Sequence, residues 1–275
     1  MISVADALLF LVPALYAAAA AVSILLFVRP ESGARRLARP LLFAAVVAHG
    51  VEIALRAAVA RRCPLGTLAE TTGLTAFALA GTYTVLSLRS GRRPTGVLIV
   101  PLSCALVLAY VLTRREAGAV NPALASPWFS LHAASAVLAV AALAVSFVHG
   151  VFYLLLYREI KAHRFGLLFR RLPPLAVLSR MTNIAAVSGF SFLTVTLAAG
   201  TAWGLRSGHA GAMLRDPMFL LSAGAWLLYA AGLAVRYLAG FRGRYTVLLS
   251  VFAFSLLILS MTAVFLLFPA LHVYR

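Results

Sequence analysis

Residues 188–236 read SGFSFLTVTLAAGTAWGLRSGHAGAMLRDPMFLLSAGAWLLYAAGLAVR, two apolar helical runs joined by a short polar loop. The loop carries His209 and ends at Asp216-Pro217. That pair is typical of a helix start, because Asp caps the first turn and Pro fits within it. In so apolar a chain, a loop with a histidine and an acid is where we expect chemistry.

The whole chain shares this apolar character. Of its 275 residues, 63% are apolar and 11% are charged, far outside the range of a soluble globular domain. The first apolar run, residues 5–28, is long enough to cross a bilayer and has no basic segment before it. We interpret that run as a membrane span and not as a cleavable signal, and the composition predicts a polytopic membrane protein.

Hydropathy divides the chain into segments that can cross a membrane as helices. Eight such spans are predicted, at residues 5–28, 40–60, 71–88, 96–113, 128–157, 181–205, 217–239 and 245–271. No internal repeat or soluble segment interrupts them. The expected fold is an all-α helical bundle that forms a single integral membrane domain over residues 1–275.

The basic residues predict how the chain is oriented. The first, third, fifth and seventh connections hold 16 of the 24 Lys and Arg residues. By the positive-inside rule these connections face the cytoplasm and both termini lie outside, as in a multi-pass protein of the bacterial cytoplasmic membrane. The basic clusters lack interleaved aromatic residues, so the net charge of +17 indicates membrane topology and not nucleic-acid binding.

The fifth connection, Arg158–Arg180, contains FGLLFRRLPPLAVL, in which apolar and basic residues alternate in blocks. This pattern predicts either a short amphipathic helix along the lipid headgroups or an ordinary basic loop.

Several enzyme classes lack support in the sequence. Cys63 and Cys104 stand alone with no CxxC motif, which argues against a thiol–disulfide reductase. No general acid–base pair or Ser–His–Asp constellation is visible. The chain is therefore not expected to be an enzyme on its own.

Two histidines lie at span ends that the predicted topology places outside, on the same side as the polar loop. They are His132, near the start of the fifth span, and His272, at the end of the eighth. Neutral imidazoles that flank an exposed loop suit axial ligation of haem iron. In the alternative interpretation each histidine only anchors its helix at the membrane interface. His209 is a further candidate ligand within the loop.

A second polar group lies inside the second span. His49, Glu52 and Arg56 follow one another at spacings of three and four, which places them on one helical face. Ionisable groups at this depth are costly, so a Glu–Arg pair facing the interior of the bundle is expected. The group is either a second ligand site or polar pathway, or a self-satisfied cluster that positions the helix.

Simpler roles are also open for the residues around the loop. Gly200 and Gly204 form a GxxxG pair, which is typical of tight helix packing in membranes. Trp203 is typical of the aromatic belt at a membrane interface.

Four segments carry a resemblance to a known family: His49–Glu70, Gly189–Gly200, Ala202–Arg236 and Leu271–Tyr274. Together they resemble the CcsA/CcmC superfamily of haem-handling membrane proteins used in cytochrome c assembly. The first is similar to the family's early segment of His, Arg, Pro and a closing Glu. The third resembles the tryptophan-rich "WWD" haem loop with the helix after it, and the fourth resembles the terminal Leu-His-x-Tyr.

The resemblance implies that haem, expected as haem b, is bound at the outer face. The residues it implies in haem binding are His49, His132, Trp203, His209, Asp216 and His272. His132 and His272 would be axial ligands, and His49 would receive haem inside the membrane. The protein would present haem to apocytochrome c beside a ResB-like membrane partner, as a component of a membrane cytochrome c haem lyase.

Two features depart from the family pattern. The loop has lost most of the family's tryptophans and only Trp203 stands before it, and Ala234 stands where the family has a second intramembrane histidine. These departures make the chain closer to the divergent HemX-like and YpjD-like members. HemX-like proteins are associated with control of glutamyl-tRNA reductase, an enzyme of haem synthesis. Two alternatives thus stay open: a HemX-like membrane regulator without turnover, and a small-solute transporter that uses the Glu52–Arg56 pair.

Overall fold

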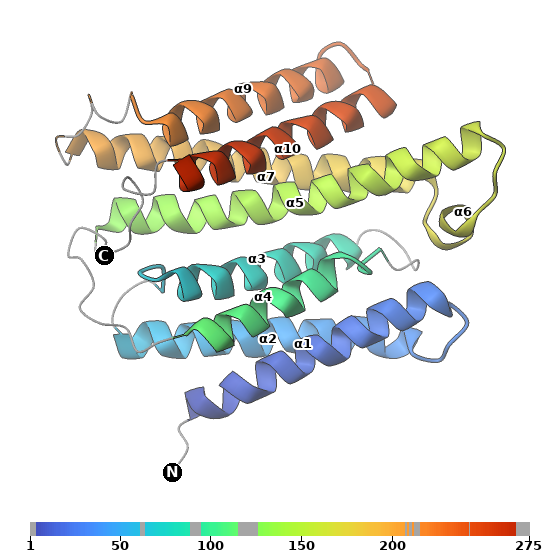
Figure 1. Cartoon of the computed structure of the whole chain (residues 1–275), viewed down its shortest axis with the longest axis horizontal. Helices are drawn as coiled ribbons and strands as arrows, with labels where there is room; N and C mark the ends of the chain where they lie inside the picture. The colour runs from blue at the N-terminus through green and yellow to red at the C-terminus, as the bar shows by residue number, and fades with distance from the viewer. Residues whose placement is uncertain are drawn as a thin grey trace. The chain divides into compact units, whose positions relative to one another are not determined.

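The computed structural model describes residues 4–60, 64–88, 95–114, 126–206, 208, 211, 215–241 and 243–267. Every regular element in these ranges is a helix, which confirms the predicted all-α fold (Figure 1). In chain order the helices are α1 (Val4–Val28), α2 (Arg35–Ala60), α3 (Leu68–Leu88), α4 (Ile99–Thr113), α5 (Pro127–Lys161), α6 (Leu167–Arg171), α7 (Leu175–Arg206), α9 (Pro217–Tyr237) and α10 (Arg244–Leu267).

The helices coincide with the eight predicted spans, and the short α6 lies in the fifth connection. Within the described ranges, six helices are long and apolar enough to cross a membrane: α1, α2, α5, α7, α9 and α10. Helix α4 is apolar but has only 15 residues. The chain is a multi-pass helical membrane protein.

Several helices extend beyond the apolar segments that predicted them. Helix α2 begins at Arg35 and α7 at Leu175, about a turn or more before the predicted starts, while α5 continues to Lys161. The added turns carry basic side chains such as Arg39 and Arg180. Hydropathy measures only the hydrocarbon-crossing part of a helix, whereas backbone hydrogen bonding continues into the headgroup region, where basic residues are solvated.

The predicted start of α9 is confirmed in detail. Asp216 is the N-cap, and its Oδ1 accepts a hydrogen bond of 2.8 Å from the backbone nitrogen of Met218. Pro217 occupies the first helical position, where its missing N–H costs nothing.

Residue contacts divide the chain into two compact units, and the first comprises Met1–Val120 and His163–Pro173. In this unit α1 and α3 each pack against both α2 and α4. Its core is built largely from small side chains with a few large ones, among them Tyr16, Ala45, Ala76, Ala80, Ile99 and Val107. The single domain predicted over residues 1–275 stays a prediction.

The fifth connection does contain a short helix, the five-residue α6. Arg171 Nη2 at its end donates a hydrogen bond of 2.8 Å to the carbonyl of Val28, where α1 ends. The rings of Phe165 and Phe169 lie 4.7 Å apart and are exposed beside it. Its position along lipid headgroups stays a prediction.

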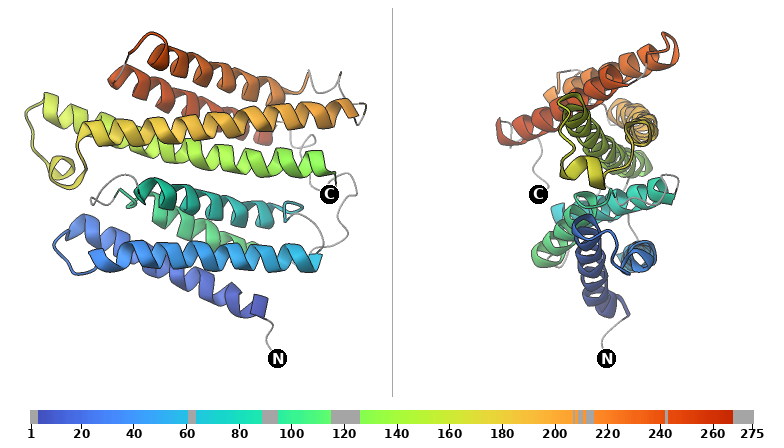
Figure 2. Two further views of the ribbon diagram at one scale, coloured as in Figure 1. Left: turned by 180° about the vertical axis from the view of Figure 1, so that it is seen from behind. Right: turned by 90° about the vertical axis from the view of Figure 1, so that its right-hand side faces the viewer.

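The second unit comprises Asn121–Ala162 and Pro174–Arg275. Helices α5 and α7 run side by side along most of their lengths, and α9 and α10 pack on each other and on this pair (Figure 2). The buried residues at the centre of the unit are Ala139, Leu143, Ala186, Leu193, Ala225, Tyr229, Ala253, Phe254 and Leu257.

Gly189 is where α7 approaches α5 most tightly. A Cβ added at Gly189 would lie 2.5 Å from Leu143 Cδ2 and 3.1 Å from the backbone nitrogen of Leu143. We expect Gly189→Ala to lower the free energy of unfolding by about 1–3 kcal/mol, because a helix backbone must move to admit the methyl group. The control is Gly224→Ala on α9, where nothing lies within 4 Å of the added atom. Equal thermal unfolding of the two variants in detergent would contradict this prediction.

Candidate functional site

His49 is fully buried halfway along α2, and three other helices of the first unit surround it. Its Nδ1 lies 3.3 Å from the hydroxyl of Tyr16 on α1. The ring of Phe77 on α3 meets it edge-on at 5.8 Å, and the ring of Tyr110 on α4 stacks at 6.4 Å. The other ring nitrogen, Nε2, is buried and has no hydrogen-bond partner among the described residues.

Glu52 lies one turn further along the same face of α2. Its Oε1 accepts hydrogen bonds from Arg56 Nε and from the Tyr110 hydroxyl, the latter at 2.8 Å. The predicted Glu–Arg pair is therefore confirmed. In the described part of the chain, however, Glu52 Oε2 is buried without a partner, like His49 Nε2.

Two partnerless polar atoms at one place are unusual. A buried donor or acceptor without a hydrogen bond costs about 1–3 kcal/mol, so native proteins rarely keep two together without a reason. The interpretation in which these polar groups only bond one another explains the hydrogen bonds of Glu52 Oε1. It does not explain why His49 Nε2 and Glu52 Oε2 have no partner among the described residues. The arrangement therefore favours a ligand position on this face of α2.

His132 lies near the start of α5 in the second unit and is half-buried. Its Nδ1 is 2.9 Å from the backbone carbonyl of Thr196 on α7. Because a carbonyl only accepts, Nδ1 is the donor, and in the neutral imidazole the lone pair then lies on Nε2. This is the arrangement found at metal-ligating histidines, in which the second nitrogen is held by a backbone carbonyl.

The hydroxyl groups behind His132 extend this network. Thr196 Oγ1 donates to Ser135 Oγ at 3.0 Å, and Ser135 Oγ donates to the carbonyl of Leu131 at 2.7 Å. The network ties α5 to α7 at the level of the histidine and so holds the imidazole in one orientation.

Gly200 makes the approach of His132 to α7 sterically feasible. A Cβ at Gly200 would lie 2.6 Å from His132 Nδ1 and 3.0 Å from its Cε1. The GxxxG pair was interpreted as a helix-packing motif, and Gly200 does lie in the contact between α5 and α7. The side chain that packs against Gly200 in this contact is His132, the candidate ligand.

Aromatic side chains lie within a turn of His132. The rings of Phe129 on α5 and Trp203 on α7 are 5.2 Å apart, and the guanidinium of Arg206 lies 4.8 Å from the ring centroid of Trp128. Such rings form an apolar wall with a polar edge, which suits either a membrane interface or the rim of a planar apolar ligand.

Other predicted site residues are not brought to His132 or His49 by the described structure. His209 and His272 lie outside the described residues, so the axial pair of His132 and His272 stays a prediction. Asp216 caps α9, and Ala234 lies on that same helix.

Three contributors were not predicted as site residues: Tyr16, Tyr110 and the backbone of Thr196. A tyrosine within an apolar span must find a partner for its hydroxyl, and that signal was available in the sequence. The choice of partner depends on which helices meet, because Tyr16 and Tyr110 are 33 and 58 residues from the side chains they contact.

The described residues form a polytopic helical membrane protein with a histidine packed between helices in each of its two units. The chain belongs to the cytochrome c assembly protein family, whose model matches residues 35–272. Membership assigns it a role in cytochrome c biogenesis and in haem handling. No curated protein matches the chain significantly.

Proposed function

We propose that the protein binds haem, as haem b, and presents it to apocytochrome c at the outer face of the bacterial cytoplasmic membrane. The observation that carries this proposal is the hydrogen bond from His132 Nδ1 to the Thr196 carbonyl. In the neutral imidazole this hydrogen bond leaves the lone pair on Nε2, which is the form that ligates iron. His272 would be the second residue to hold the haem iron. Residues 1–275 form one membrane domain with both termini outside in this proposal.

His49 is the second haem contact that we propose, within the membrane. Its buried Nε2 without a protein partner fits an iron ligand, and the imidazole is held by Tyr16 on the opposite nitrogen. Glu52 Oε2 on the same helix face is also buried without a partner among the described residues, and it would be a second contact in this proposal. The donor set therefore fits haem.

The chain positions the cofactor and does no acid–base chemistry of its own in this proposal. Bound haem supplies the vinyl groups to which the client's cysteine thiols add. His132 is held by Thr196, Trp203 and Phe129 supply apolar surface, and His209 lies in the loop that Asp216 closes by capping α9. A ResB-like membrane protein is the proposed partner.

The test is a haem stain and a visible absorption spectrum of the protein, expressed with a haem precursor and purified in detergent. We expect a Soret band in the wild type and its loss in the double variant His132→Ala/His272→Ala. The matched control is His163→Ala, since His163 is an exposed histidine of the fifth connection. Wild-type protein without haem would overturn the proposal.

That negative result would leave the HemX-like regulator as the second candidate. Ala234, in place of the family's second intramembrane histidine, is the observation that favours it. A regulator acts through its cytoplasmic connections, so charge-removing variants in the Arg158–Arg180 connection would then change the cellular level of glutamyl-tRNA reductase. This second candidate would be excluded if the wild type carries haem and the variants in the Arg158–Arg180 connection leave the level of glutamyl-tRNA reductase unchanged.

A further inference from the structure

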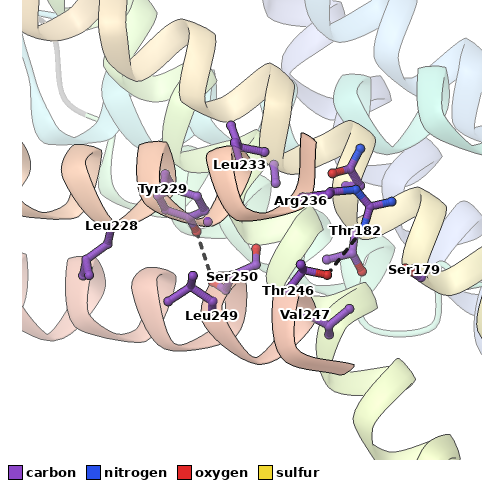
Figure 3. A pocket seen from close by; sticks show the side chains of 13 residues that line it. Ser179, Thr182, Leu228, Tyr229, Leu233, Arg236, Thr246, Val247, Leu249 and Ser250 are labelled. Carbon is purple, nitrogen blue, oxygen red and sulfur yellow. Dashed lines mark hydrogen bonds between the residues drawn. The ribbon is translucent and has the colours of Figure 1, made fainter. Parts of the chain in front are cut away.

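An open groove lies between α7, α9 and α10, entirely within the second unit, with about 370 Å³ of empty space when the solvent at its mouth is included (Figure 3). Its lining changes in character along the helices. Apolar side chains such as Leu228 and Leu249 line one part, and polar groups gather where α9 ends and α10 begins. The polar residues of this rim are Ser179, Asn183, Arg236 and Thr246.

Arg236 brings a positive charge to the rim. Its Nη1 donates only a long hydrogen bond, 3.4 Å, to Thr246 Oγ1 (Figure 3). The sequences of α7, α9 and α10 contain no Asp or Glu, so no carboxylate on these helices can neutralise the guanidinium. A guanidinium at the end of a membrane-spanning helix lies where acidic lipid headgroups can pair with it, which makes an external anion the expected partner.

The remaining rim groups are donors that suit an anion. Asn183 uses one amide hydrogen on the hydroxyl of Tyr237, at 2.7 Å, and has a second amide hydrogen to offer. Ser179 adds a hydroxyl group, whereas the hydroxyl of Thr246 already donates to the carbonyl of Gly243. Arg180 on α7 and Arg244 at the start of α10 add two positive charges at the same helix ends. Glu159, near the end of α5, adds one negative charge, so the sum of the three still favours an anion.

We propose that this groove binds an anionic phospholipid, with the phosphate at the Arg236 rim and an acyl chain along the apolar part. From Leu228 to Arg236 the groove follows α9 for roughly 12 Å, enough for a headgroup and the first part of a chain. Basic pockets between membrane helices characteristically hold acidic headgroups, whereas a zwitterionic lipid would leave Arg236 without net compensation.

The experiment measures phospholipid bound to the detergent-purified full chain by native mass spectrometry, with phosphatidylglycerol and phosphatidylcholine added as competing probes. We expect one retained phosphatidylglycerol, and a preference over phosphatidylcholine that falls at least about fivefold in Arg236→Gln. Arg236→Lys should keep most of that preference because it keeps the charge. Arg180→Gln is the matched control, since Arg180 lies at the same end of α7 but does not line the groove.

Two results would overturn the proposal. Equal retention of both lipids by wild type and Arg236→Gln would show only the ordinary lipid ring around a membrane protein. Displacement of phosphatidylglycerol by equimolar haemin would show that the groove takes a carboxylate amphiphile instead. Thermal unfolding of each variant identifies any loss that comes from misfolding, and Arg236→Lys then decides the outcome. Neither the probe nor the readout depends on haem delivery.

Discussion

Gly200→Ala is expected to lower the haem content of the purified protein by about 10- to 100-fold, the usual cost of removing the group that orients a metal-ligating histidine. The added Cβ would lie 2.6 Å from His132 Nδ1. The imidazole must swing away and lose its bond to the Thr196 carbonyl, so Nε2 would no longer be oriented toward the proposed iron. The prediction rests on the proposed haem site.

The same substitution should leave folding nearly intact. Only the end of a half-buried side chain has to move, in contrast with Gly189, where the backbone of α5 lies within 3.1 Å of the added atom. The expected signature is thus a weak Soret band at an almost unchanged melting temperature. Gly224→Ala, which adds a methyl group into open space, should keep both properties of the wild type.

A full Soret band in Gly200→Ala would show that the orientation of His132 does not matter for haem. A large fall in melting temperature would instead make Gly200 a helix-packing residue, as the GxxxG interpretation has it. Measuring haem content and thermal unfolding on the same preparation separates these outcomes.

The fold was predictable because hydropathy identifies a membrane helix from composition alone. Each predicted apolar segment is a helix. The predicted boundaries are wrong at some helix ends, as at Arg35 and Leu175, because the helix continues beyond the apolar segment. The local signal at Asp216-Pro217 was sufficient because a cap depends only on neighbouring residues.

The candidate site was only partly predictable. The Glu52–Arg56 pair follows from spacing along one helix, so the sequence contained it. The partners of His49 and His132 come from other helices, and hydropathy does not determine which helices meet. Gly200 shows the difference, because its sequence context predicts close approach but not that His132 is the residue that approaches.

Removal of the Glu52 carboxylate is expected to have the largest effect on stability. Glu52→Ala leaves the Arg56 guanidinium and the Tyr110 hydroxyl without their shared acceptor. Breaking one side of a buried ion pair typically costs about 3–5 kcal/mol of unfolding free energy. Because the Arg56 side chain is 19% exposed and reaches some water, we expect the lower end of that range, about 3 kcal/mol.

Related variants separate charge from hydrogen bonding. Glu52→Gln keeps an acceptor for Tyr110 and should cost less, about 1–2 kcal/mol. The double variant Glu52→Ala/Arg56→Ala should be more stable than Glu52→Ala, since it no longer leaves a guanidinium without its carboxylate. Glu31→Ala, an exposed carboxylate between α1 and α2, is the matched control and should change stability by less than about 0.5 kcal/mol.

The measurement is reversible unfolding in mixed detergent, followed by far-ultraviolet circular dichroism because the tryptophans all lie in the second unit. If Glu52→Ala unfolds like Glu31→Ala, the pair contributes no stability. In that case Glu52 would be retained for a ligand alone, with Oε2 as its point of contact. If Glu52→Ala loses about 3 kcal/mol and the double variant recovers part of it, Oε1 stabilises the first unit and leaves Oε2 and His49 Nε2 to meet the ligand.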